Sequence, residues 1–168
     1  ISFLFFSALG IKQRLSAQNE IQKLEPLAEL AIHISNVVHE TQKERGRTAV
    51  FIGSGRTNGF NELKQQQQLS DQKIADLNLF LQTFNLNDRN EQAFTHIRSA
   101  WADLKNLQSH RNGVAKDLPL KQAITHYSSL HTRFLNGVAG FSEVLSNQDL
   151  LTHMAAYVNL MKPKERGG

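Results

Sequence analysis

Apolar residues recur at steps of three and four along most of the chain. The clearest run follows Pro26 and comprises Leu27, Leu30, Ile34, Val38 and Thr41, and it resumes at Thr48 and Ile52. An α-helix has about 3.6 residues per turn, so residues with this spacing lie on one face. The run therefore predicts an amphipathic helix whose core-facing stripe extends over residues 27–52.

Three later stretches repeat the pattern. The first has Leu63, Ser70, Ile74, Leu77, Leu81 and Phe84 on one face. The second has Phe94, Ile97, Trp101 and Leu104. The third has Ile124, Tyr127, His131, Phe134, Val138, Phe141 and Leu145. Strand-like alternation is almost absent, and one apolar face per helix is typical of a bundle, so we expect an all-α, up-and-down antiparallel helical bundle.

Turn residues set the expected limits of these helices. Asn112-Gly113 is predicted to end the second helix, since both residues tolerate the left-handed conformation. Asp117 and Pro119 form a start signal for the third. Ser146 or Asn147 caps a last segment, and Pro163 is expected to interrupt it because proline lacks a backbone N–H. Gln65–Gln68 reads as a solvated helix face.

Arg45 is the residue that points to chemistry. The rhythm of the stripe places Arg45 between Thr41 and Thr48, so an arginine interrupts a core-facing row, whereas Arg47 falls on the opposite face. A buried guanidinium keeps its charge and is costly when unpaired, so Arg45 must meet either a carboxylate or an external anion. Its tetrapeptide, Lys-Glu-Arg-Gly, recurs at 164–167.

Composition narrows the function classes. The chain has 168 residues, a formal charge of +4 and no cysteine, which fits one domain without thiol chemistry or cysteine metal sites. Basic residues are scattered, which argues against nucleic-acid binding. The histidine spacing argues against a metal site, the glycines at 53–59 read as a helix end and connection, and no catalytic motif is found. We therefore expect neither an enzyme nor a cofactor.

The first eleven residues, ISFLFFSALGI, carry no charge, and Lys12 and Arg14 follow them. Eleven apolar residues are too few to cross a bilayer alone, but they suit the end of a membrane helix, with residues 1–14 comprising that end and its flank. A signal-peptide remnant or a buried first helix are the alternatives. Residues 15–168 would then form the helical domain.

The stretch from His33 to Phe51, with His39, Gln42, Arg45 and Thr48 at its centre, resembles the first signature of the nitrate- and nitrite-sensing (NIT) family. The segment 157–167 is similar to the start of the second signature of that family. The resemblance implies an all-helical sensor domain of bacterial chemoreceptors or sensor kinases, lying outside the cytoplasmic membrane. It also implies that residues 15–168 stop short of the last helices of the domain.

Carried onto this chain, the resemblance implies that Arg45 and Arg166 bind the anion, which would be nitrate or nitrite. It also implies a membrane anchor at the N-terminus and a homodimer. Planar nitrate matches the planar donor fork of arginine. The rival interpretation is a helical ligand-binding or dimerisation module whose arginines are paired internally and which senses another signal. A soluble antiterminator-like regulator is a third class.

Overall fold

The part of the chain described by a computed structural model, residues 2–89 and 91–144, is helical and contains no strand. Its elements are α1 (Ser2–Gly53), α2 (Phe60–Thr83), the short 3-10 helix η1 (Leu86–Asp88), α3 (Gln92–Leu104), α4 (Leu107–Lys116) and α5 (Leu120–Ala139). Side chains are described from Glu25 onward. The predicted all-α class is confirmed.

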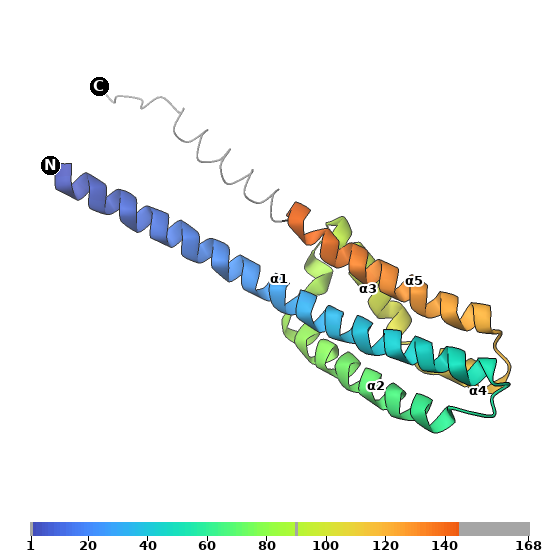
Figure 1. Ribbon diagram of the computed structural model, residues 1–168. Helices are drawn as coiled ribbons and strands as arrows, with labels where there is room; N and C mark the ends of the chain where they lie inside the picture. Colours follow the sequence, from blue (N-terminus) through green and yellow to red (C-terminus); the bar gives the residue numbers. More distant parts are fainter. Residues whose placement is uncertain (1, 90, 145–168) are drawn as a thin grey trace.

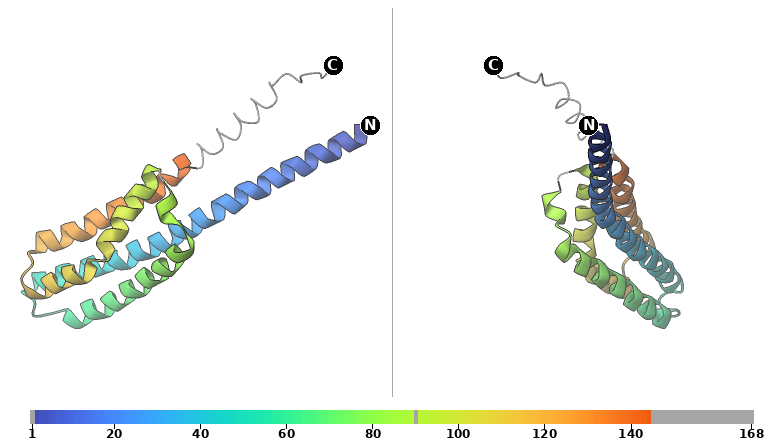
Figure 2. Two further views of the ribbon diagram at one scale, coloured as in Figure 1. Left: turned by 180° about the vertical axis from the view of Figure 1, so that it is seen from behind. Right: turned by 90° about the vertical axis from the view of Figure 1, so that its left-hand side faces the viewer.

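The helices form an up-and-down bundle around α1 and α5 (Figure 1). Helix α1 packs against both α2 and α5, and α5 packs against α3. The N-terminal half of α1 extends beyond the other labelled helices (Figure 1 and the left view of Figure 2). Pro26 lies inside this continuous helix. Residue 14, where we expect the membrane segment to end and the domain to begin, also lies inside it, and this division stays a prediction.

Within the described ranges, no helix combines the length and the apolar character that crossing a membrane requires.

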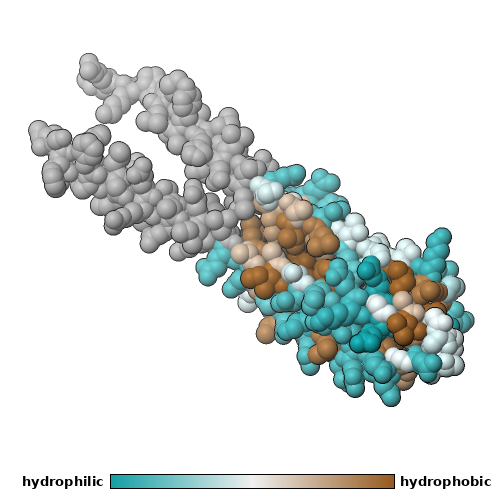
Figure 3. Space-filling view, viewed as in Figure 1, coloured by the Kyte–Doolittle hydropathy of each residue, from teal (hydrophilic) through white to brown (hydrophobic). Residues whose placement is uncertain are grey.

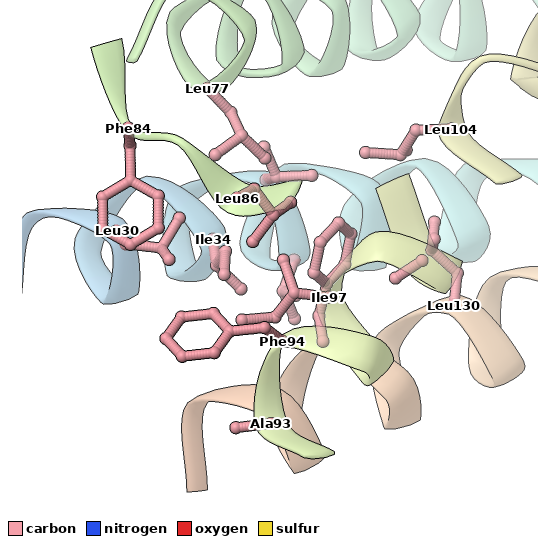
Figure 4. Close-up of a cluster of buried hydrophobic side chains, with 14 of the residues drawn as sticks. Leu30, Ile34, Leu77, Phe84, Leu86, Ala93, Phe94, Ile97, Leu104 and Leu130 are labelled. Atoms are coloured by element: carbon pink, nitrogen blue, oxygen red, sulfur yellow. The ribbon is translucent and has the colours of Figure 1, made fainter. Parts of the chain in front are cut away.

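The main core fills the space between α1, α2, α3 and α5 (Figure 4). Its fully buried members include Leu30, Ile34, Leu77, Phe94, Ile97, Leu130 and Phe134. Burial of each such side chain stabilises the fold by about 1.5–3 kcal/mol relative to exposure. The periodic stripes of the sequence therefore correspond to one shared apolar core.

On the face shown in Figure 3, apolar residues gather in two patches with hydrophilic residues between them. Among the side chains that the structure describes, the exposed large apolar ones are Ile32, Val50, Phe60, Leu69, Leu79, Leu120 and Leu135.

Two local predictions were wrong. Asn112-Gly113 does not end a helix, because α4 continues to Lys116 and the interruption lies earlier, between α3 and α4. Burial of Val114 on the last turn of α4 outweighs the local signal. Gln66 and Gln67 are buried rather than solvated. The Gln66 amide donates hydrogen bonds to the backbone carbonyl and the carboxylate of Glu40, which supplies the partners that a buried amide needs.

The connection from α1 to α2 has the predicted glycine-rich form. Gly55, Arg56 and Gly59 have positive φ values of 69°, 66° and 81°. Arg56 is held in this conformation while its guanidinium donates hydrogen bonds to the carbonyl oxygens of Val114 and Leu118, at 3.0 and 2.8 Å. The loop is thereby tied to the junction between α4 and α5.

Some of the predicted features lie outside the described residues. They are Leu145, the last helix with its cap, Pro163 and Arg166.

Helices α3 and α5 pack closely at Gly137. A Cβ atom at this position would lie 2.4 Å from the side chain of Ile97 and 2.9 Å from the carbonyl oxygen of Ala93. No real Cβ atom fits at such distances, so a glycine is needed here for the helices to pack.

We predict that Gly137→Ala lowers the free energy of unfolding by about 1–3 kcal/mol through overpacking. Gly46→Ala is the matched control, because nothing lies within 4 Å of a Cβ at this helical position. It should raise stability by up to about 1 kcal/mol through helix propensity. Urea denaturation of both variants tests this, and equal effects would refute the close approach.

Candidate functional site

On the part of α1 whose side chains are described, the buried charged residue is Glu44, not Arg45. Glu44 has no exposed surface and lies between buried Thr41 and Thr48 on the stripe, whereas Arg45 is half-buried. Steps of three and four from Thr41 to Thr48 allow either residue at the intermediate position. The expectation that Arg45 faces the core was therefore wrong by one residue, because the phase of α1 turns Glu44 inward.

Glu44 is neutralised by a buried arginine on α4. Arg111, 5% exposed, donates two hydrogen bonds to the Glu44 carboxylate, from Nε at 2.7 Å and from Nη2 at 2.9 Å. Its Nη1 donates to Asp71 Oδ1 at 2.6 Å, and the hydroxyl of Tyr127 donates to Glu44 Oε1 at 2.8 Å. This Glu44–Arg111 cluster joins α1, α2, α4 and α5. The carboxylates of Glu44 and Asp71 and the hydroxyl of Tyr127 all form their hydrogen bonds within the cluster. The cluster is therefore an internal brace and not an open anion site.

Tyr127 remains protonated within the cluster. Burial, followed by the negative charge of Glu44, raises the pKa of the Tyr127 hydroxyl far above its ordinary value. The hydroxyl is thus a permanent donor to the Glu44 carboxylate.

The sequence did not single out Arg111, because the helix was expected to end beside it. Leu107 and Val114, four residues before and three after, are buried on the same face of α4. That spacing was the signal that could have found it.

Arg45 lies at the edge between α1 and α5. Its Nη1 donates to Ser128 Oγ at 3.0 Å, and the Ser128 hydroxyl in turn donates to the carbonyl oxygen of Ile124 at 2.9 Å. Ser128 is neutral, and no carboxylate among the described residues pairs with Arg45. The guanidinium is therefore held in place by Ser128, while no described carboxylate compensates its charge.

Glu44 and Glu40 are the carboxylates on α1 that could pair with Arg45, and both are bound to other residues. Glu44 is held by Arg111. Glu40 accepts from Lys43 at 2.9 Å and from the Gln66 amide at 2.7 Å. The Lys43 hydrogen bond is the largest cause of the lowered pKa of Glu40, which keeps it ionised at neutral pH.

One turn before Arg45, a buried polar pair joins the same two helices. Thr41 Oγ1 lies 2.9 Å from Nε2 of His131, which is 4% exposed. The Thr41 hydroxyl also lies 2.7 Å from the carbonyl oxygen of Val37, to which it donates. Nε2–H of His131 is therefore the donor to Thr41, and Nδ1 carries a lone pair that has no partner among the described residues.

Arg47 faces away from this edge, as predicted. It is exposed and lines a surface hollow of about 290 Å³ together with Lys43, Gly46, Val50 and Gln66. The two cations make this hollow the competing place for an anion.

A larger surface cavity, about 590 Å³, lies along the other side of α5, and its lining does not include Arg45. Arg133 in this cavity is ion-paired with Asp103 and donates to Ser99. Its charge is therefore already compensated. Within the described ranges, no cluster of three histidine or acidic side chains could hold a metal ion.

Comparison with known proteins gives one match. The sequence model of a protein family described as nitrate and nitrite sensing (NIT) matches residues 36–168, which is most of the chain and includes Arg45. No curated protein and no solved structure matches the chain.

We predict that Arg111→Ala lowers the free energy of unfolding by about 3–5 kcal/mol, because it leaves the Glu44 carboxylate buried without a cation. Arg47→Ala, at an exposed arginine, should change stability by less than about 0.5 kcal/mol. Urea denaturation at pH 7 compares them. An Arg111→Ala protein as stable as the Arg47→Ala control would contradict the role of the brace.

The free energy of unfolding should also decrease as the pH is lowered. Burial is the main cause that lowers the pKa of both His110 and His131 from 6.5 to about 4. Between these values the unfolded chain binds protons that the folded chain does not, so stability decreases as the pH falls from about 6.5 to about 4. We expect the urea midpoint to be lower at pH 4.5 than at pH 7, with a smaller decrease in His110→Gln. A midpoint independent of pH would contradict this.

Proposed function

The chain belongs to the nitrate- and nitrite-sensing family, and from this premise we propose that it senses nitrate or nitrite through Arg45 as the sensor domain of a bacterial signalling receptor. Members of this family are sensing modules of signalling proteins and not catalysts. The proposal assigns the anion to the edge between α1 and α5.

One observation carries the assignment to Arg45. Its guanidinium is half-buried and fixed by Ser128, yet no described carboxylate neutralises it, whereas the neighbouring Arg111 is held by Glu44 and Asp71. A fixed, uncompensated guanidinium favours an anion, since each charge-assisted hydrogen bond contributes about 1.5–3 kcal/mol. The planar donor fork also suits the three coplanar oxygens of nitrate better than a lysine does.

A single guanidinium accounts for only part of a micromolar affinity, which requires about 8 kcal/mol. In this proposal Arg166, outside the described residues, supplies the second guanidinium. The repeated Lys-Glu-Arg-Gly sequence at 43–46 and 164–167 supports this pairing. The anion would then join α1 to the segment that carries Arg166 and relieve the repulsion between the two cations.

The proposal places the domain outside the cytoplasmic membrane of a bacterium, as part of a homodimeric chemoreceptor or sensor kinase. Residues 1–14 end a membrane helix, and residues 15–168 belong to the sensor domain. The uncharged run at 1–11, with Lys12 directly after it, supports the anchor.

The continuous α1 supplies a route for the signal. Residue 14 and Arg45 lie on the same uninterrupted helix, about 45 Å apart at a rise of about 1.5 Å per residue. A shift of α1 against α5 on anion binding would therefore reach the N-terminal end of the helix. The anion drives this shift only to the extent that it prefers one arrangement of the helices over the other.

We predict that Arg45→Ala weakens nitrate binding by about ten- to a hundredfold, the loss of one or two charge-assisted hydrogen bonds. Isothermal titration of nitrate, nitrite and chloride into the full-length protein measures this. Arg45→Lys should restore little, because a lysine retains the charge but not the planar fork.

Arg47→Ala is the matched control, two residues away on the same helix and exposed. It should bind nitrate as the unsubstituted protein does. Binding lost in Arg47→Ala and retained in Arg45→Ala would move the site to the hollow between Lys43 and Arg47, and no saturable nitrate binding would refute the proposed function.

A further inference from the structure

The edge that presents Arg45 also contains a titratable group. On α1, Thr41 and Arg45 are separated by one turn, and on α5 their respective partners His131 and Ser128 are likewise separated by one turn. Two contacts of about 3 Å, between Thr41 and His131 and between Arg45 and Ser128, therefore form one polar layer between the helices. The layer contains one permanent cation and one imidazole.

His131 has an unused nitrogen in this layer. Nε2–H is committed to Thr41, and Nδ1 is buried with no partner among the described residues. A buried polar atom without a partner is costly, and a core histidine that served packing alone would be expected to satisfy both nitrogens. A proton on Nδ1 would turn it into a donor and give the ring a charge.

The cation Arg45 opposes this proton. Burial, and then the charge of Arg45, lower the pKa of His131 to about 4, so the imidazole is neutral at pH 7. No charged side chain of α2, α3 or α4 in the described ranges acts on the ring. Tyr127 on α5 lies beside it, with ring centres 6.5 Å apart, and keeps its own proton.

We propose that an anion binds at Arg45 together with a proton on His131, so that His131 is a second anion-binding group of this sensor. The inference rests on the proposed function of Arg45. An anion at the guanidinium cancels the charge that opposes protonation and adds a negative charge that favours it. By linkage, a ligand that promotes proton binding must itself bind more tightly as protons become available.

The size of the effect follows from the pKa values. The anion offsets the effect of the Arg45 charge while the effect of burial stays, so we expect the pKa of His131 to rise part of the way from about 4 and nitrate affinity to increase by roughly two- to tenfold between pH 7.5 and pH 5. Nitrate itself stays an anion throughout this range, so the change belongs to the protein. The receptor would then respond more strongly to nitrate in acidic surroundings.

The test is isothermal titration of nitrate into the full-length protein at pH 7.5, 6.5 and 5, with circular dichroism at each pH to confirm that the helices persist. At pH 5 the titration is repeated in two buffers that differ in ionisation enthalpy, which reports proton uptake without any substitution. We expect affinity to increase as pH falls, with measurable uptake of a fraction of one proton per nitrate at pH 5.

His131→Gln should abolish the pH dependence, because its amide can still donate to Thr41 but does not titrate. His39→Gln is the control, since His39 lies on α1 with a 65% exposed side chain, and it should retain the dependence. Arg45-dependent binding with no proton uptake, or an unchanged pH dependence in His131→Gln, would overturn the role of His131 and leave Arg45 standing. No nitrate binding at any pH would overturn both.

Discussion

The buried ion pair of Glu44 and Arg111 determines how α1 is turned in the bundle. A carboxylate with no exposed surface must find a cation, and Arg111 supplies it with two hydrogen bonds while also reaching Asp71 on α2. Because Glu44 is directed to α4, the next residue, Arg45, is carried to the edge with α5. Glu44, which forms the brace, and Arg45, the candidate anion-binding residue, are thus adjacent in the same tetrapeptide and have different roles.

This arrangement resolves the question that the sequence raised about Arg45. An arginine in a core-facing row has two possible partners, a carboxylate or an anion. In the proposed function the protein uses both solutions, but on different arginines. Arg111 receives the internal carboxylates, and Arg45 is left with a neutral serine. Removing only one partner of a well-formed buried pair is costly, so the Glu44–Arg111 brace holds α1 in one orientation in the bundle.

Periodicity predicted the helical class and most of the core, because burial of an amphipathic face is a property that each helix carries in its own sequence. Leu30, Ile34, Leu77 and Phe134 are buried where the spacing placed them. It could not decide between Glu44 and Arg45, since both fit a spacing of three or four, and only contact with α4 selects one. Arg111 was hidden for a related reason, because Asn112-Gly113 resembles a helix end and burial of Val114 overrides it. Thr41 and His131 are 90 residues apart in sequence, so no local pattern encodes their contact.

The central claim is that Arg45, and not the more exposed Arg47 or the braced Arg111, holds the anion. A crystal structure of the full-length sensor domain with nitrate tests it most directly. The account predicts nitrate oxygens about 3 Å from the Arg45 guanidinium, at the edge between α1 and α5, with the Glu44–Arg111 pair intact. Nitrate bound instead in the hollow between Lys43 and Arg47, or bound to Arg111 with Glu44 displaced, would contradict it.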